Sequence, residues 1–489
     1  MNELRRQLMR AGAGALALGA YPGRVRADDA DALVGTWVGA LALPQGGRAD
    51  YALRIARAPS GALLVRVTIP DMHAFDAAIA EVESLGGGRF RLDPFGTLAT
   101  LGGDVLAGQF AYLRLPFELR RAAAVPPWRE APEAPSSPAP APRWTRTLPG
   151  ALWASPVARE GVAYLGDAAG NVHALRARDG APLWTHAHGT PIYGDACIDG
   201  RGITFVDERG AICRVDRRTG RPRWRVDPDA ATGPAAGSAD FTFNHRTPRA
   251  TLADGVLYVG NRDGRVRALA VDDGRALWQA DAGGAVMSGI AVTARLLIAG
   301  TFARDGVVAV DRRDGRVAWT FPTAQPVSSA PVVAGGIVLA GCRDFGIHGL
   351  ALDSGAPRWV NSYLFSWVES SPVVAGGTAY FGSSDLRAIR AVDVATGRTR
   401  YTTDVRGLAW GTPAQAGGRL YAGTAGQKDV LVTHRPGLAA VDRDTGALLW
   451  RREFAMGDAK MAGVVGSPCI AGRTLIAACV DGTVQAFDL

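Results

Sequence analysis

A short phrase that recurs along the chain constrains its fold more than any other feature of the sequence. Its clearest copy runs from Ala440 to Trp450 and reads as a strand, a tight turn and a second strand. In this copy, Asp442 and Thr445 can hydrogen-bond the backbone of the turn. Gly446 can adopt the positive φ that such a turn needs, and Trp450 ends the phrase with a large apolar side chain. The phrase therefore predicts a β-hairpin closed by an aromatic residue.

Six looser copies of the phrase precede this one. The aromatic residue ending each copy recurs at intervals of 40, 54, 41, 40, 42 and 49 residues, at Trp184, Trp224, Trp278, Trp319, Trp359, Tyr401 and Trp450. Strand-like repeats of roughly this length are typical of β-propellers, in which each repeat forms a blade of four strands. We therefore predict an all-β propeller, in which these aromatic residues dock one blade against the next.

A second signature predicts eight blades and shows how the ring closes. An apolar first strand opens each unit beside a Ser-Pro, Thr-Pro or related pair, at positions 156, 196, 248, 290, 331, 372, 413 and 468. The chain ends inside the third strand of the eighth unit. Residues 143–146 precede the first unit and carry their own tryptophan, Trp144. We expect this N-terminal strand to complete the last blade, which leaves the ring without an open end.

The repeats resemble the PQQ-repeat family of eight-bladed, quinoprotein alcohol dehydrogenase-like propellers. The resemblance rests on the Ala-x-Asp, Gly and Trp positions of the phrase and covers about 346 residues, from Trp144 to Leu489. It implies the fold but not one activity. The family includes calcium- and PQQ-dependent dehydrogenases and also non-catalytic propellers, among them the lipoprotein subunit of the machine that assembles outer-membrane barrels.

The order of composition along the chain predicts four parts. Residues 1–27 resemble a twin-arginine signal peptide, with Arg5 and Arg6 before a short apolar run and a small-residue cleavage site. Residues 28–122 predict a small β-rich domain with short alternating strands, and their Gly35-Thr-Trp opening weakly resembles calycin-type barrels. Residues 123–143 are rich in proline and predict an extended spacer, and residues 144–489 form the propeller.

Charge and cysteine content exclude several classes of function. The formal net charge is +8, of which the first 27 residues hold +4 (five Arg and one Glu), and both signs are interspersed afterwards. This pattern does not indicate nucleic-acid binding. No apolar stretch after the start is long enough to span a membrane. The five cysteines form no CxxC or CxxCH motif, so we expect buried free thiols.

The candidate binding site lies on the propeller face where the repeat is broken. The three longest insertions, at 226–246, 424–437 and 451–465, all belong to one face, and function in repeat proteins often resides in such insertions. The residue three positions before each proline signature should ring the axis on that side: Trp153, Tyr193, His245, Met287, Ser328, Glu369, Trp410 and Val465. The ligand-binding candidates are Trp153, Tyr193, His245, Glu369 and Trp410; the alternative is that they only plug the channel.

Two classes of function remain open from the sequence. The resemblance implies that a PQQ dehydrogenase would carry a vicinal cysteine pair and a calcium site, but the pair is absent. Glu369 and Asp195 are weak candidates for calcium ligands, and no catalytic residue is predicted. We therefore expect an exported, non-enzymatic binding or scaffold propeller of the bacterial periplasm with no firmly predicted cofactor.

The alternative is a periplasmic oxidoreductase that uses PQQ or another cofactor to oxidise alcohols or sugars. In a third possibility, the N-terminal domain senses a ligand and the propeller serves as its platform. The expected partner is a protein or a small ligand on the insertion-bearing face.

Overall fold

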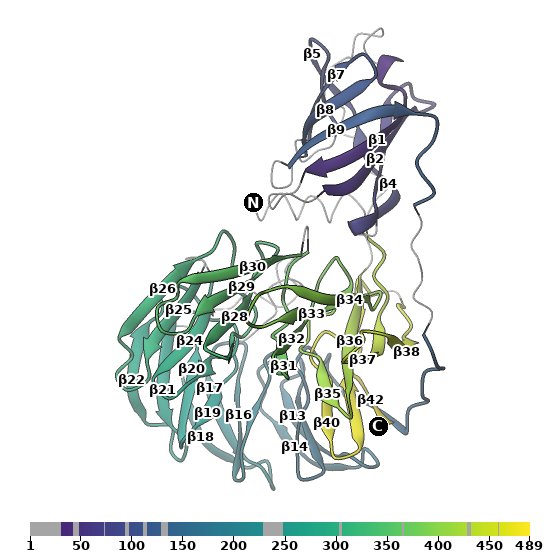
Figure 1. Ribbon diagram of the computed structural model, residues 1–489. Coiled ribbons are helices and arrows are strands. Elements are labelled where there is room, and N and C mark those ends of the chain that lie inside the picture. The colour runs from purple at the N-terminus through teal and green to yellow at the C-terminus, as the bar shows by residue number, and fades with distance from the viewer. Residues whose placement is uncertain are drawn as a thin grey trace. The chain divides into compact units, whose positions relative to one another are not determined.

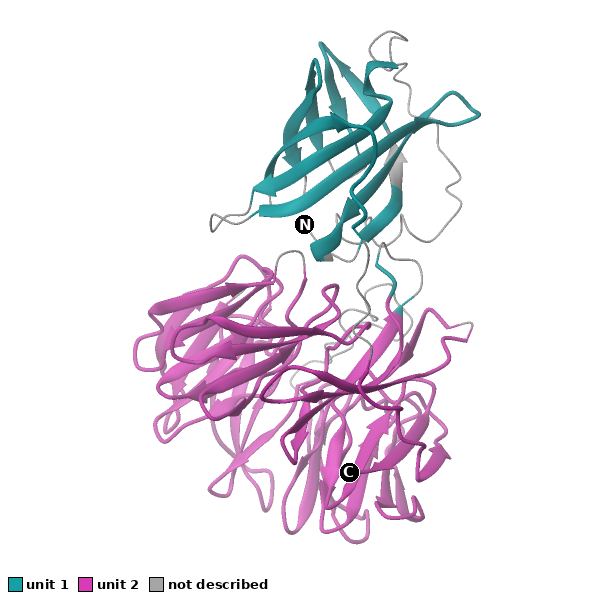
Figure 2. Cartoon of the chain, turned by 45° about the vertical axis from the view of Figure 1, so that its right-hand side comes forward, with its two compact units in different colours: residues 1–132, 427–433 teal, residues 133–426, 434–489 magenta. Residues whose placement is uncertain are grey.

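A computed structural model describes residues 31–42, 48–72, 74–92, 97–110, 115–128, 135–227, 248–302, 306–363, 366–427, 432–457 and 459–489. The chain forms two compact units (Figure 2). The first comprises residues 1–132 and 427–433, and the second comprises residues 133–426 and 434–489. The predicted signal peptide at 1–27 lies outside the described residues and stays a prediction.

The first unit is a curled antiparallel sheet of nine strands, a half-barrel that is coloured teal in Figure 2. The order across the sheet is β4-β3-β2-β1-β9-β8-β7-β6-β5. The strands are β1 Gly35–Ala42, β2 Arg48–Arg57, β3 Leu63–Ile69, β4 Ala74–Glu81, β5 Glu83–Gly86, β6 Arg89–Arg91, β7 Leu98–Gly102, β8 Val105–Phe110 and β9 Leu115–Ala122, with a 3-10 turn η1 at Pro70–Met72.

Alternating residues of these strands build the core of the half-barrel. Trp37 is fully buried and its indole N–H donates to the Leu33 carbonyl at 2.9 Å. Tyr51 lies edge-on to Phe110 and Phe117, with ring centroids 5.7 and 5.3 Å away. The period-two pattern predicted short strands of this kind because one face of each strand is buried and the other faces solvent.

The second unit is a propeller of eight blades, and each blade is an antiparallel sheet of four strands that runs from the axis outward (Figure 1). Blades 1 to 4 contain β11 Val157–Arg159, β12 Val162–Gly166, β13 Asn171–Arg176 and β14 Pro182–Ala187; β15 Cys197–Ile198, β16 Gly202–Val206, β17 Ile212–Asp216 and β18 Pro222–Val226; β19 Thr251–Ala253, β20 Val256–Gly260, β21 Arg265–Ala270 and β22 Ala276–Asp281; and β23 Ala291–Val292, β24 Leu296–Thr301, β25 Gly306–Asp311 and β26 Val317–Pro322.

Blades 5 to 8 continue the same order. They contain β27 Val332–Ala334, β28 Ile337–Gly341, β29 Gly346–Ala351 and β30 Pro357–Ser362; β31 Val373–Ala375, β32 Thr378–Gly382, β33 Ala388–Asp393 and β34 Thr399–Asp404; β35 Ala414–Ala416, β36 Arg419–Gln427, β37 Gly437–Asp442 and β38 Leu448–Glu453, with β39 Met461–Gly463 paired to β36; and β40 Cys469–Ala471, β41 Thr474–Ala478, β42 Thr483–Asp488 and β10 Trp144–Thr147.

The eighth blade joins the two ends of the propeller region, as the sequence predicted. Strand β10 pairs with β42, and Trp144 lies opposite Ala486 in the register. The Arg143 guanidinium adds an ion pair with Asp488 at 2.9 Å. The eight-bladed fold with strand closure is therefore confirmed. Within the described residues, no helix is long and apolar enough to cross a bilayer.

The recurring phrase builds the junctions between blades. Seven of the eight closing aromatic side chains reach the turn of the next blade, where each hydrogen-bonds a backbone carbonyl and covers a glycine of positive φ. The hydrogen bonds are Trp144 to Ala177 at 2.8 Å, Trp184 to Arg217 at 3.1 Å, Trp224 to Val271 at 3.0 Å, Trp278 to Arg312 at 3.2 Å, Trp319 to Leu352 at 2.9 Å, Trp359 to Val394 at 3.1 Å and Tyr401 to Arg443 at 2.7 Å.

The eighth aromatic residue, Trp450, has different surroundings because the last blade has no such turn between β42 and β10. It is 8% exposed and packs in one cluster with Phe487 and, at its edge, Ala139 and Leu489. The chain terminus and the proline-rich segment therefore cover the position that a turn covers in the other junctions.

Part of the proline-rich segment is held by the propeller. The backbone N–H groups of Ser136 and Ser137 donate to the carbonyls of Leu448 and Leu449 at 3.1 and 2.9 Å. Arg452 donates to the Pro140 carbonyl at 3.3 Å. Residues 136–140 of the expected spacer at 123–143 thus lie along the outer strand of blade 7, where the serines satisfy backbone groups on that edge.

Candidate functional site

Residues from all eight blades line one hollow, which places it on the propeller axis. The hollow has a volume of about 70 Å³. Its lining includes Trp153, Ser155, Tyr193, Asp195, Arg249, Met287, Ala330, Ser371, Trp410, Thr412, Val465 and Ser467. Pockets that enclose a drug-sized ligand are several-fold larger, about 300 to 1,000 Å³. The hollow formed by the described residues is thus a shallow mouth.

Five of the eight predicted ring residues lie in this lining: Trp153, Tyr193, Met287, Trp410 and Val465. Ser328 and Glu369 are not among the lining residues and are 0% and 3% exposed. His245 lies outside the described residues. The sequence pattern gives the aromatic members equivalent positions before the inner strands, and Trp153, Tyr193 and Trp410 all line the hollow. It could not show which polar members turn away from the hollow.

Glu369 belongs to a buried ion pair. Its Oε1 atom accepts from Arg343 Nε at 2.5 Å, and both side chains are less than 10% exposed. The Arg343 guanidinium also stacks over the rings of Trp367 and Phe302, at 4.4 and 5.2 Å from their centroids. A buried charge of this kind is stabilised by its partner, so Glu369 balances Arg343. Sequence reasoning missed Arg343 because no motif marked it.

Asp195 lines the hollow, but its carboxylate already contacts two other groups. Its Oδ1 atom accepts the Ser155 N–H at 2.7 Å, and its Oδ2 atom lies 3.7 Å from Arg249. Glu369 lies at the start of blade 6 and Asp195 at the start of blade 2, so they stand on opposite sides of an eight-bladed ring. One calcium ion needs six to eight oxygen ligands at 2.3 to 2.6 Å, as is usual for this cation. These two weak candidates do not form such a set.

A chain of hydrogen bonds links the inner ends of neighbouring blades. The Ser371 hydroxyl accepts the Ala330 N–H, the Ser467 hydroxyl accepts the Thr412 N–H, and the Ser155 hydroxyl accepts the Ser467 N–H, each at 2.8 Å. The Asp195 carboxylate accepts the Ser155 N–H in the same way. These contacts explain the Ser-Pro form of the signature: the serine hydroxyl satisfies a partly buried backbone donor of the preceding blade.

Two of the predicted insertions build one wall of the mouth. Strand β39, from the 451–465 insertion, pairs with β36, and an isolated bridge joins Leu408 to Ala425. Leu408, Ala425 and Met461 then pack with Trp410 and Val465 in one buried cluster, with Trp153 at its edge. The insertions therefore fix the aromatic side of the mouth. The third insertion, at 226–246, lies almost wholly outside the described residues.

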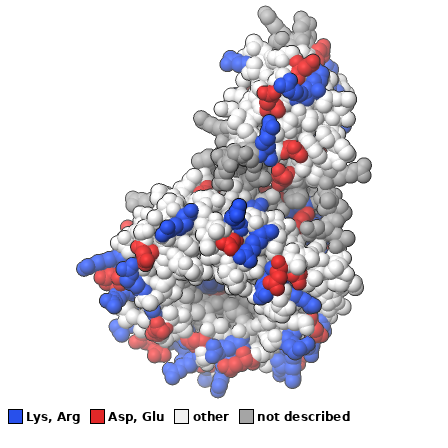
Figure 3. All heavy atoms as spheres, in the orientation of Figure 1, with Lys and Arg blue, Asp and Glu red and all other residues white. Residues whose placement is uncertain are grey.

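The charged side chains of the described residues show no dominant sign on the side seen in Figure 3. On the face that Figure 3 shows, basic and acidic side chains are interspersed over the described residues. Many form pairs across neighbouring strands, such as Arg214 with Asp199 at 2.6 Å and Arg387 with Asp404 at 2.7 Å. The five cysteines are free; Cys213, Cys342 and Cys479 are buried as expected, whereas Cys197 and Cys469 are partly exposed.

A family model described as "Outer membrane protein assembly factor BamB" matches residues 136–285, 262–405 and 387–489. The chain belongs to this family. The matches cover the whole propeller, and they confirm the PQQ-like repeats inferred from the recurring phrase.

Relatives from several bacteria carry that same name. The protein from Moranella endobia is 29% identical over 245 residues, which are 45% of this chain and 59% of the relative. The protein from Yersinia pestis is 25% identical over 249 residues, 46% of this chain and 60% of the relative. The chain thus spans about 60% of the length of these two. The protein from Burkholderia pseudomallei is 24% identical over 360 residues, 68% of this chain and 83% of the relative.

Solved structures share the fold. BamB from Moraxella catarrhalis has a TM-score of 0.55 at 16% identity and covers 72% of this chain and 100% of its own. The quinohemoprotein alcohol dehydrogenase from Comamonas testosteroni has a TM-score of 0.51 at 14% identity and covers 71% of this chain and 76% of its own. At these identities the likeness concerns the propeller alone.

Proposed function

We propose that this chain is a non-enzymatic propeller of the bacterial periplasm that binds a protein partner during the assembly of outer-membrane proteins. The observation that carries the proposal is the family match across all eight blades, whose model and relatives are named for outer membrane protein assembly. The propeller supplies a rigid ring, and a ring of this kind presents loops for binding without needing a reaction centre.

The mouth supports a macromolecular partner. A hollow of about 70 Å³ leaves little room for a cofactor, and among its aromatic lining residues Trp153 is half-buried, whereas Tyr193 and Trp410 are 5% and 4% exposed. Aromatic residues are enriched where protein interfaces gain most of their binding energy. The insertions that wall the mouth enlarge the same face, so we place the partner there.

The oxidoreductase alternative finds little support in the residues present. Its calcium site would need Glu369, which is held by Arg343 at 2.5 Å, and Asp195, which is held by the Ser155 N–H and lies across the ring. The residues therefore do not fit a PQQ and calcium site of the kind the resemblance implied. Export by the twin-arginine route remains a prediction from Arg5 and Arg6.

The proposal is tested by deleting the gene in the source bacterium. We expect lower amounts of folded outer-membrane barrel proteins, measured by their heat-dependent mobility in gel electrophoresis, and recovery on expression of the wild-type chain. A Trp153→Ala chain should accumulate normally because Trp153 is only half-buried at the rim, yet restore assembly poorly. Unchanged barrel proteins in the deletion strain would contradict the proposal.

A separate measurement distinguishes the alternative. The purified chain is incubated with PQQ and calcium and then separated from free quinone. We expect no quinone absorbance to remain with the protein and no reduction of a dye by alcohols or sugars. Retained quinone together with dye reduction would favour the oxidoreductase.

A further inference from the structure

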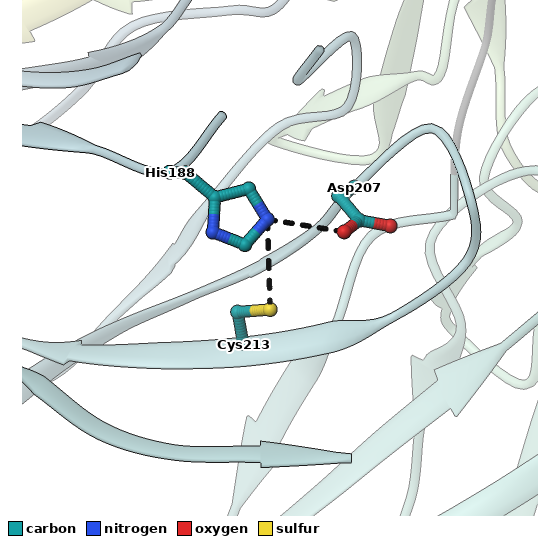
Figure 4. A group of neighbouring side chains, drawn as sticks. All are labelled: His188, Asp207 and Cys213. Carbon is teal, nitrogen blue, oxygen red and sulfur yellow. Dashed lines mark hydrogen bonds and ion pairs between the residues drawn. The ribbon is translucent and has the colours of Figure 1, made fainter. Parts of the chain in front are cut away.

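Three side chains of different chemistry converge at the junction of blades 1 and 2. His188 follows β14, the outer strand of blade 1, while Asp207 precedes β17 and Cys213 lies in β17 of blade 2. His188 Nε2 lies 3.0 Å from Asp207 Oδ2 and 3.9 Å from Cys213 Sγ (Figure 4). One imidazole nitrogen, one carboxylate oxygen and one sulfur all lie within 4.8 Å of one another.

The geometry argues against a nucleophilic Cys-His-Asp arrangement. In such a triad the acid holds one ring nitrogen of the histidine while the other nitrogen takes the proton of the nucleophile. Here both Asp207 and Cys213 face the same nitrogen, Nε2, as the two dashed lines of Figure 4 show. One nitrogen cannot donate to the acid and accept from the thiol at once. The three atoms point instead at a common centre.

Each donor is held in place by contacts outside the cluster. The Asp207 side chain is 0% exposed, and its other oxygen, Oδ1, accepts the Ala211 N–H at 2.9 Å, so Oδ2 is aimed at His188. The backbone N–H of His188 donates to the Gly170 carbonyl at 2.8 Å, and the imidazole ring lies edge-on to Phe205, with ring centroids 5.1 Å apart. Orientation of ligands by such surrounding contacts is typical of metal sites.

We propose that His188, Asp207 and Cys213 bind one divalent transition-metal ion, with Zn²⁺ the best match. Sulfur, imidazole nitrogen and carboxylate oxygen together suit this borderline-soft ion, and three protein ligands leave a fourth position for water. Tetrahedral coordination at the usual Zn²⁺ bond lengths would place nitrogen and sulfur about 3.6 Å apart and nitrogen and oxygen about 3.4 Å apart. The observed separations of 3.9 and 3.0 Å need only small shifts. The ion would link blade 1 to blade 2.

Metal binding requires Cys213 to lose its proton and the nearby Arg225 cation to move. Burial raises the pKa of the Cys213 thiol to about 12, so the sulfur carries a proton in the free protein and loses it when it coordinates the ion. Arg225 lies opposite Cys213 on β18, with Nη1 at 3.8 Å from the sulfur and 3.6 Å from Asp207 Oδ2. The Arg225 guanidinium therefore lies beside the position that the metal ion would occupy. Because the Arg225 side chain is 42% exposed, it can swing out to solvent.

A similar cluster in blade 5 is a weaker candidate and a matched control. Cys342, Asp344 and His348 also lie within 4.8 Å of one another. The Cys342 thiol, however, donates to the Gln325 carbonyl at 3.1 Å and lies 3.5 Å from the Pro326 carbonyl. Two carbonyl oxygens so close disfavour a thiolate, whereas a guanidinium lies near Cys213. Blade 1 has only a His173–Asp167 pair at 2.8 Å, without a cysteine.

The experiment uses the purified mature chain after treatment with a chelator, and Co²⁺ as a spectroscopic substitute for Zn²⁺. We expect one equivalent of Co²⁺ to bind with a thiolate-to-cobalt charge-transfer band, with release of a proton. Cys342→Ser should keep the band. Cys213→Ser should lose it, and Zn²⁺ affinity, measured by competition with a coloured chelator, should fall about tenfold or more.

Two results would overturn the proposal: no charge-transfer band in the saturated wild-type chain, or a band that survives in Cys213→Ser. Arg225→Ala gives a second test that retains all three ligands. Removing a cation that lies within 4 Å of two ligand atoms should tighten Zn²⁺ binding about fivefold or more. Unchanged or weaker binding by this variant would also contradict the site.

Discussion

Both the outer turns and the inner ends of the blades join neighbouring blades, but they do so through different contacts. At the outer turns one arrangement recurs: an aromatic side chain covers a positive-φ glycine and donates to a carbonyl, as Trp319 does with Gly355 and Leu352. At the inner ends the contacts vary from blade to blade, with Ser155, Asp195, Ala330 and Gly289 at equivalent positions. Because the regular outer turns hold the blades together, the residues at the axis can differ from blade to blade.

This difference assigns different tasks to the two regions. A junction repeated around the ring tolerates little change because each glycine has an indole or phenol ring directly against it. The inner positions hold backbone donors with small side chains, and the residues beside them form the mouth. We expect substitutions at the outer turns to affect stability most and substitutions at the mouth to affect binding most.

The sharpest test of the comparison is Gly355→Ala at an outer turn. A Cβ atom there would lie 2.4 Å from the Trp319 ring, at a backbone φ of +70°. Left-handed strain and overpacking together should lower the free energy of unfolding by about 2–4 kcal/mol. The measurement is urea denaturation followed by tryptophan fluorescence.

Gly377→Ala is the matched control for that variant. Gly377 has almost the same φ, +74°, but a Cβ atom added there would meet no atom of the described residues within 4 Å. Gly377→Ala should lower the free energy of unfolding through backbone strain alone, by about 1–2 kcal/mol. Equal losses in the two variants would show that the aromatic contact does not define the outer junction.

Ser155→Ala tests the inner junction and should have a smaller effect. It removes the hydroxyl that accepts the Ser467 N–H at 2.8 Å where the ring closes. Leaving that partly buried donor unsatisfied should cost about 1–2 kcal/mol in denaturant unfolding. The exposed Ser354, whose hydroxyl accepts a 3.3 Å bond from Ala356, offers the control Ser354→Ala, with a cost below about 0.5 kcal/mol. A Ser155 variant as stable as the Ser354 variant would contradict a role in closure.

The smallest expected effect concerns the acid of the outer turn and depends on pH. The Arg400 guanidinium, together with the Thr396 hydroxyl and N–H, lowers the pKa of Asp393 from 3.8 to about 2. A lowered folded-state pKa stabilises the protein above pH 3.8, and this contribution is lost as the pH falls towards 2. At pH 6 we expect Asp393→Asn to cost about 1 kcal/mol, allowing for solvent screening of this surface group.

The control for this prediction is the same pair of proteins at low pH. The difference in unfolding free energy between wild type and Asp393→Asn should shrink at about pH 3, because Asp393 of the unfolded chain takes up a proton below its pKa of 3.8 while the folded protein does so only near pH 2. A difference that stays constant or grows as the pH falls would show that the charge of Asp393 does not stabilise the turn.

Much of the propeller could be predicted because its signals are local and periodic. The spacing of Trp184 to Trp450, the Asp-Gly turns and the tryptophan at 144 predicted the blades and their closure, and the β10–β42 pairing confirms it. The docking of Ser136 and Ser137 on blade 7 escaped prediction, because proline-rich composition indicates an extended chain but not the edge on which it lies.

The candidate site could be predicted only in outline. Position within the repeat placed Trp153, Tyr193 and Trp410 at the mouth. It did not reveal the buried pair of Glu369 with Arg343, which lies 26 residues earlier in the sequence. Charged side chains are ordinarily expected at the surface, so their burial was not anticipated. The cluster at His188 was missed for a similar reason: its residues are 19 and 25 positions apart from that histidine and form no motif.

The sequence by itself determined the eight-bladed ring and its closure, because glycine, proline and tryptophan act through local geometry that repeats from unit to unit. Only the tertiary structure decided which polar side chains meet. Asp195 accepting the Ser155 N–H, Arg343 with Glu369, and His188 facing both Asp207 and Cys213 all join different strands or blades. Such contacts depend on packing across sheets, where side-chain direction and burial set the distances that sequence spacing does not contain.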